Sequence, residues 1–188
     1  MSRKLLILVL AFSAVLLFSS VAMAAPRVDP SAMSIDVGLK VNWAAVVAVA
    51  DLNMPLGDSP VSFRAVAEAG FWYWGGFDVG VTAVVMYPVV MEKEFQVGIF
   101  GGLQAGYNAY WPFLGIALGV AVEVPINPEF TLMFEGMYAP AYEFGYGFGW
   151  NHGGYGIYGI YELNDDYTLN FGVRSIGLLP GFTVGLTF

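Results

Sequence analysis

The run Phe182-Thr183-Val184-Gly185-Leu186-Thr187-Phe188 has a large apolar side chain at every second position, with Thr or Gly between them. Successive side chains of a β-strand point to opposite faces, so this run predicts a strand with one apolar face and one small, polar face. The same alternation recurs along the chain. It restricts the register of the strands, because a shift of one residue would exchange the two faces of a strand.

The chain is strongly apolar, but its apolar residues do not form membrane helices. Hydrophobic residues make up 57% of the sequence, charged residues 12%, and the mean hydropathy is +0.65, which suits a membrane protein better than a soluble domain. Beyond Ala24, no run of about 18 apolar residues is free of charges, Pro and Gly. Apolar residues instead form packets such as 79–87 and 114–122, close to the length of a tilted membrane strand.

Strands that cross a membrane cannot leave an open sheet edge, because the backbone groups of that edge would have no hydrogen-bond partner in lipid. The sequence therefore predicts an all-β fold, namely a closed, antiparallel, up-and-down transmembrane β-barrel. Polar connections rich in Pro, Gly, Asn or acidic residues separate its hairpins. They lie at 53–60, 88–94, 125–129 and 164–166.

These connections predict ten strands. The expected strands are 33–41, 44–54, 61–71, 77–87, 95–106, 113–124, 130–138, 155–163, 167–176 and 181–188. An even number agrees with a closed up-and-down barrel. Eight strands is the alternative, because residues 40–43 in the first hairpin contain no Gly to form a tight turn.

Most charges within the expected strands fall on the face opposite the apolar one. We expect seven of them to form an interior charge cluster: Lys40, Arg64, Glu68, Asp78, Glu123, Glu135 and Arg174. Pairing would offset the cost of dehydrating each ion, so the cluster could close the barrel as a network of ion pairs. Its acidic residues outnumber its basic ones, so it could also form a cation-preferring constriction.

The first residues have the order of a secretory signal peptide. Arg3 and Lys4 precede an apolar run at 5–18, and the small-residue pattern Ala22-Met23-Ala24 follows. The apolar run is shorter than the roughly 20 residues that a membrane-spanning helix needs. We therefore expect residues 1–24 to be cleaved and residues 25–188 to form a single barrel domain.

Aromatic residues gather at both ends of the expected strands, where Trp and Tyr favour the membrane–water interface. One aromatic girdle would contain Phe71, Trp72, Tyr73, Trp74, Tyr107, Tyr110, Trp111, Tyr138, Tyr142, Tyr146 and Trp150. The second girdle would contain Tyr87, Phe95, Phe130, Tyr167 and Phe188.

The sequence gives little support for catalysis, cofactor binding or nucleic-acid binding. His152 is the sole histidine and Cys is absent, so a two-histidine metal site cannot form. We expect no catalytic, metal or cofactor-binding residue. Loss of Arg3 and Lys4 with the signal peptide would lower the formal net charge from −8 to −10, which excludes a nucleic-acid partner. Residues 154–159 match G-x-G-x-x-G but open no helix, so they are interpreted as strand glycines.

The signal peptide, the alternation, the polar turns and the terminal Phe188 strand together resemble the small outer-membrane β-barrel proteins of diderm bacteria, including porin-like members. The resemblance implies a location in the bacterial cell outer membrane, surrounded by its lipid. It also implies assembly by periplasmic chaperones and the barrel-assembly machinery, with an assembly signal at Phe182, Val184, Leu186 and Phe188. The turn at 164–166 would then be periplasmic. Residues 139–152 are short and aromatic, unlike the long hydrophilic loops of adhesin-like members.

The expected function is therefore an integral outer-membrane barrel that is structural or forms a narrow, mildly cation-selective pore. One alternative is a lipid-modifying enzyme, a hydrolase or acyltransferase, at the outer rim. It rests on His152 beside Asn151, with Glu143 not far in sequence and Ser175 as the nearest following Ser. Another alternative is a surface-interaction protein. The sequence does not determine the oligomeric state.

Overall fold

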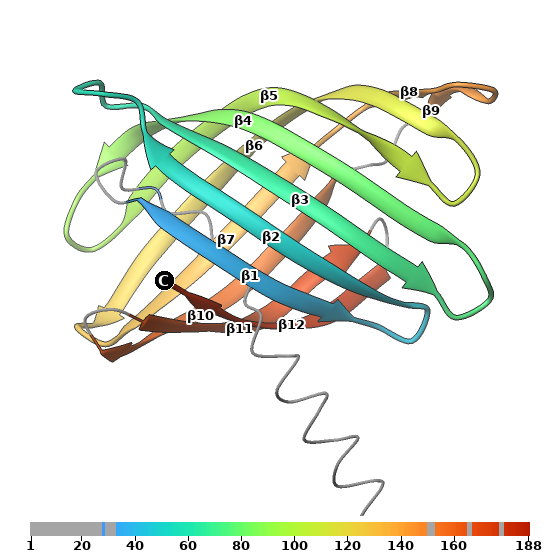
Figure 1. Ribbon diagram of the computed structural model, residues 1–188. Helices are drawn as coiled ribbons and strands as arrows, with labels where there is room; N and C mark the ends of the chain where they lie inside the picture. The colour runs from blue at the N-terminus through green and yellow to red at the C-terminus, as the bar shows by residue number, and fades with distance from the viewer. Residues whose placement is uncertain (1–27, 29–32, 150–152, 165–166, 177–178) are drawn as a thin grey trace, which may run out of the picture.

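The structure is a computed structural model that describes Val28 and residues 33–149, 153–164, 167–176 and 179–188. The expected signal peptide, residues 1–24, lies outside the described residues. Ten long antiparallel strands wind around a common axis (Figure 1). They are β1 (Ser34–Val41), β2 (Ala45–Pro55), β3 (Ser62–Trp72), β4 (Phe77–Met91), β5 (Gln96–Asn108), β6 (Pro112–Asn127), β7 (Phe130–Tyr138), β10 (Gly154–Asn164), β11 (Tyr167–Ile176) and β12 (Leu179–Thr187).

The sheet closes on itself. Each strand pairs with its neighbour in the chain, β7 pairs with β10, and β1 pairs with β12 to complete the ring. The first and last strands align from Asp36 opposite Thr187 to Val41 opposite Phe182. The ten-strand, antiparallel, closed barrel is thus confirmed, and the eight-strand alternative is wrong. No helix in the described part of the chain is long and apolar enough to span a membrane.

The turn between β1 and β2, which made eight strands an alternative, is formed by an asparagine in place of a glycine. The Asn42 side-chain oxygen accepts hydrogen bonds from the backbone N–H groups of Ala44 and Ala45, both at 2.7 Å. The Asn42 N–H donates to the Ala45 carbonyl at 3.0 Å. Asn side chains form such local turns readily, so the hairpin needs no Gly.

In two other hairpins an Asn side-chain oxygen also accepts a backbone N–H in the turn. Asn108 accepts from the N–H of Trp111 between β5 and β6, and Asn164 accepts from the N–H of Tyr167 between β10 and β11, both at 3.0 Å. The β3–β4 connection uses glycine instead, because Gly75 has φ +88° and Gly76 has φ +132°, values that other residues rarely adopt.

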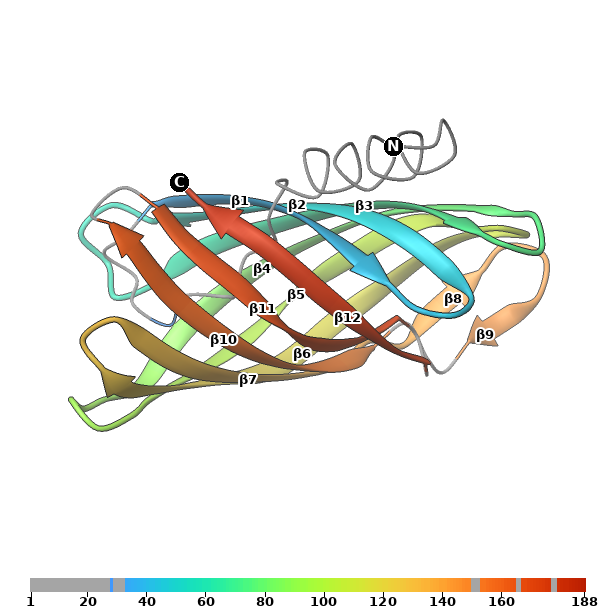
Figure 2. The same cartoon turned by 90° about the horizontal axis from the view of Figure 1, so that it is seen from below.

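The barrel has two distinguishable ends. We call one the turn end, where β2–β3, β4–β5, β6–β7 and β10–β11 connect and where the C-terminus lies, and the other the loop end (Figures 1 and 2). At the loop end a small hairpin, β8 (Ala141–Glu143) and β9 (Gly147–Gly149), continues the wall by pairing β8 with β6 beyond the end of β7. This hairpin is absent from the expected strands.

Two strands run further toward the turn end than expected. β4 continues to Met91 and β6 to Asn127, although each contains a proline at a polar connection. Both tolerate it through a register shift, between Pro88 and Val90 in β4 and between Pro125 and Asn127 in β6. A bulge at this point accommodates a residue that cannot donate a ladder hydrogen bond.

The two faces of the wall follow the expected alternation. Large apolar side chains remain exposed on the outer face of all the strands except β2 and the central part of β3. These side chains include Val81, Val85, Ile99, Leu103, Leu114, Ile116, Leu118, Val120, Phe134, Ile157 and Phe171. The interior contains buried charged and polar side chains, among them Asp36, Lys40, Asp51, Arg64, Gln104, Glu123, Glu135, Asn170 and Arg174. A surface that is apolar outside and polar inside is the inverse of a soluble barrel and matches a wall solvated by lipid.

Glycines on the inner face allow bulky side chains to fill the interior. A Cβ atom on Gly119 of β6 would collide with the ring of Phe100 on β5, and one on Gly106 would lie 2.8 Å from the ring of Phe113. These glycines therefore do not simply leave empty space, because aromatic rings occupy the volume beside them.

Candidate functional site in the barrel interior

An ion-pair cluster crosses the interior, and Arg64 of β3 is one of its fully buried members. Its guanidinium lies 2.6 Å from Asp51 of the neighbouring strand β2 and 3.0 Å from Glu135 of β7. The Arg64 Nε donates a further hydrogen bond to Asp51 at 2.7 Å. All three side chains are buried, so their mutual pairing compensates for lost hydration.

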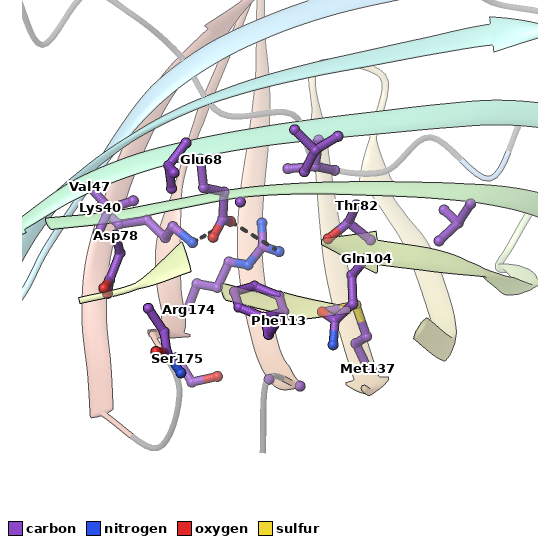
Figure 3. A pocket seen from close by; sticks show the side chains of 18 of the residues that line it. Lys40, Val47, Glu68, Asp78, Thr82, Gln104, Phe113, Met137, Arg174 and Ser175 are labelled. Carbon is purple, nitrogen blue, oxygen red and sulfur yellow. Dashed lines mark hydrogen bonds and ion pairs between the residues drawn. The ribbon is translucent and has the colours of Figure 1, made fainter. Parts of the chain in front are cut away.

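A second group of charges meets beside the first. Lys40 of β1 lies 2.5 Å from Glu68 of β3, and Arg174 of β11 lies 3.8 Å from the same Glu68 oxygen. Figure 3 shows Arg174 reaching into the interior toward Glu68, with Lys40 approaching the same carboxylate. Three strands that are not neighbours therefore contribute to one contact.

The structure brings together five of the seven residues expected in the charge cluster. The other two have different contacts. Asp78 accepts a hydrogen bond from the indole N–H of Trp72 at the loop end, and Glu123 accepts one from the backbone N–H of Val28 at 2.6 Å toward the turn end. Asp51 completes the cluster in their place. Its position on the polar face was visible in the sequence, but its pairing depends on the register that puts Asn53 opposite Arg64.

The cluster is balanced in charge, and the other interior charges of the described residues are acidic. Lys40, Arg64 and Arg174 face Asp51, Glu68 and Glu135. Within the described residues the only other basic side chain is Lys93, which is exposed at the β4–β5 turn. Acidic side chains therefore define the charge on both sides of the cluster, with Asp78 toward the loop end and Asp36 and Glu123 toward the turn end.

An apolar layer fills the interior on the turn-end side. It contains Val28, Met86, Met133 and Ile160, all fully buried and part of one contiguous core. The interior charges are expected from the sequence, whereas this apolar layer is not. The signal was present, because Met86 and Met133 occupy inward positions of the alternation in β4 and β7.

On the loop-end side the interior contains a cavity of about 230 Å³. Trp72, Asp78, Asn108, Phe113 and Ser175 line it near the ends of their strands. Members of the ion-pair cluster line it as well, namely Lys40, Arg64, Glu68, Glu135 and Arg174. The cavity therefore ends at the charge cluster, with aromatic and polar side chains around it (Figure 3).

The described part of the chain does not bring together the residues on which the lipid-modifying enzyme alternative rests. His152 and Asn151 lie outside the described residues. Glu143 accepts a hydrogen bond from Asn108 at 3.0 Å, and the Ser175 hydroxyl oxygen accepts the Tyr155 N–H at 2.9 Å. Among the described residues, no group of three or more potential metal ligands is close enough to hold an ion.

The residues of the expected assembly signal lie on β12 and at its end. Phe182, Val184 and Phe188 are exposed on the outer face, and Leu186 is partly exposed on the same face. The ring of Phe188 packs edge-on against Tyr167 of β11 at 5.6 Å between centroids. Their role in assembly remains a prediction.

No protein-family model matches this sequence, and no curated protein matches it. Solved structures do match. A KdgM porin superimposes with a TM-score of 0.50 at 14% sequence identity, over 82% of this chain and 98% of the porin. The protein has the fold of a small outer-membrane β-barrel. A second structure, a KdgM porin in complex with disordered oligogalacturonate, matches with a TM-score of 0.47 at 11% identity, over 82% of this chain and 98% of that one. At such identities the likeness of this barrel to the porins concerns the fold alone.

Proposed function

We propose that this protein is an integral β-barrel of a bacterial outer membrane, whose interior is closed in the observed conformation and forms at most a narrow, mildly cation-selective pore. The exposed apolar outer face supports the membrane location, because lipid would cover the side chains that water would otherwise contact. The short connections and the C-terminus at the turn end support a periplasmic position for that end.

The charge distribution along the interior is the observation that supports the proposed cation selectivity. The ion-pair cluster has equal numbers of basic and acidic side chains, whereas the described charges on either side of it, Asp78, Asp36 and Glu123, are all acidic. Cations would be attracted at both sides of the constriction and anions would be repelled. The buried cluster and the apolar layer leave little room for conductance until they rearrange.

Single-channel recording of the refolded protein in planar bilayers tests this proposal. The unmodified protein should show little conductance or only small, flickering events. Combining Arg64→Ala with Arg174→Ala should leave carboxylates unpaired, draw in water and produce a cation-preferring current. The matched control combines Met86→Ala with Met133→Ala, which removes volume from the apolar layer without changing the charges.

Three outcomes would contradict the proposal. A large, steady conductance in the unmodified protein would show that the barrel is open. An anion-preferring current in the Arg64→Ala, Arg174→Ala variant would refute the selectivity. If that variant stayed silent while the methionine variant conducted, the apolar layer alone would close the barrel.

A further inference from the structure

Arg174 has unused hydrogen-bonding capacity beside the loop-end cavity. The residue is only 8% exposed, its Nη2 atom lies 3.8 Å from Glu68, and its Nη1 atom has no hydrogen-bond acceptor among the described residues. A buried guanidinium normally has its donors satisfied by carboxylates or other acceptors. Arg174 also lines the cavity, so its guanidinium brings a positive charge to the cavity wall.

Glu68 presents the complementary group at the same place. Its hydrogen bond with Lys40 and its ion pair with Arg174 both use the Oε1 atom. A third of the Glu68 side chain is exposed, and the residue lines the cavity. The second carboxylate oxygen can thus accept a hydrogen bond from a ligand cation while the first keeps its partners.

Apolar side chains form much of the remaining cavity wall. Val66 and Val84 line it from the barrel wall, Phe100 and Phe113 contribute aromatic rings, and Met137 contributes a thioether. Binding sites for small molecules commonly combine such a wall with a few polar groups that fix the orientation of the ligand. Here two of the polar groups, Arg174 and Glu68, have opposite charges and are adjacent.

We propose that this cavity binds a small zwitterion with an apolar body, of the chemical class of apolar α-amino acids. The ligand carboxylate would accept from Arg174, its ammonium would donate to Glu68, and its side chain would contact the wall formed by Phe113 and Val66. In an α-amino acid a single carbon separates the two charged groups, which suits a guanidinium and a carboxylate that are themselves neighbours.

The overall electrostatics favour a zwitterion over a simple ion. An anion would pass Asp78 near the loop end and approach a chain with a formal net charge of −8. The cavity is lined by three basic side chains, Lys40, Arg64 and Arg174, and by three acidic ones, Glu68, Asp78 and Glu135. A molecule with both charges and no net charge can pair with side chains of both signs. The volume of about 230 Å³ far exceeds the roughly 30 Å³ share of one water molecule.

Isothermal titration calorimetry on the refolded protein in detergent micelles tests the proposal, with L-phenylalanine as the probe. Three analogues each lack one feature: 3-phenylpropionate lacks the ammonium, 2-phenylethylamine lacks the carboxylate, and glycine lacks the apolar body. L-phenylalanine should bind saturably, and each analogue should bind at least tenfold more weakly. No saturable binding of L-phenylalanine, or equal binding of an analogue, would overturn the proposal without any mutation.

Variants then assign the contacts. Arg174→Gln should weaken L-phenylalanine binding at least tenfold but change 2-phenylethylamine binding little, and Glu68→Gln should do the reverse with 3-phenylpropionate as the insensitive probe. Asp36→Asn is the matched control, because it removes an interior charge that does not line the cavity. Equal weakening in Asp36→Asn and Arg174→Gln would refute the site. The readout is binding, so it is independent of whether the barrel conducts.

Discussion

Arg64 on β3 and Glu135 on β7 lie 3.0 Å apart across the barrel interior, although 71 positions separate them in the sequence. On the shorter way around the ring, β4, β5 and β6 stand between their strands. The pair therefore joins opposite walls through the interior, while the backbone ladders join only neighbouring strands. Its geometry depends on the complete barrel and cannot form within one hairpin.

Arg64→Ala should strongly destabilise the barrel. The substitution would leave Asp51 and Glu135 buried without their cation, and removal of one partner from a buried pair costs about 3–5 kcal/mol. Urea-induced unfolding of the protein in lipid vesicles measures this change. Lys93→Ala, at the exposed β4–β5 turn, is the control and should change the free energy of unfolding by less than about 0.5 kcal/mol. A similar small effect of Arg64→Ala would contradict the pairing.

The assignment of faces predicts opposite tolerances for two adjacent residues. Phe134 is exposed on the outer face, and Glu135 is buried inside. Phe134→Arg would put a charge into lipid at a cost of up to about 2–4 kcal/mol. Glu135→Gln keeps a side chain that can accept a hydrogen bond from Arg64, and Arg64 retains Asp51 as its ion-pair partner. The yield of folding into lipid vesicles should fall much further for Phe134→Arg. Comparable yields for the two variants would mean that the assignment of faces is wrong.

The strands, their faces and the closed barrel could be predicted because each depends on local alternation and on one global condition, the absence of free edges in a membrane. Of the expected cluster, Lys40, Arg64, Glu68, Glu135 and Arg174 meet in the interior. The strand face on which each of these residues lies is enough to predict that its side chain points inward.

What the sequence left open depends on register and on backbone irregularity. Asp51 belongs to the cluster because of how β2 aligns with β3, and alternation alone does not set that alignment. The β8–β9 hairpin was missed because three-residue strands are too short for a periodicity to be visible. The extensions of β4 and β6 past their prolines depend on bulges, which follow no simple pattern of residue types.

The first hairpin gives a third prediction. Asn42→Ala removes the acceptor for the N–H groups of Ala44 and Ala45, and an unsatisfied buried donor costs about 1–3 kcal/mol. Asn42→Asp is the matched control, because its carboxylate oxygen can accept the same hydrogen bonds. Urea unfolding in vesicles should show a clear loss for Asn42→Ala and a smaller one for Asn42→Asp. If the two losses were equal, the side-chain acceptor would not hold this turn.

The last prediction asks whether the Phe188 side chain acts as an assembly signal or only stabilises the folded barrel. The backbone of Phe188 exchanges hydrogen bonds with Ile35 in both directions, and a substitution of the side chain leaves these bonds possible. Its ring packs against Tyr167, so the aromatic contact can be removed from either side. If the terminal ring acts as an assembly signal, Phe188→Asp should lower the amount of protein in the outer membrane several-fold.

Tyr167→Ala is the matched control for this experiment, because it deletes the same ring contact and leaves Phe188 in place. Its amount in isolated outer membranes, measured by immunoblotting, should stay near that of the unmodified protein. Normal levels of Phe188→Asp would refute a signal at this residue. An equal loss in both variants would assign the effect to the contact between the two rings. Recognition by the assembly machinery, in contrast, would make only the Phe188 substitution harmful and not the Tyr167 substitution.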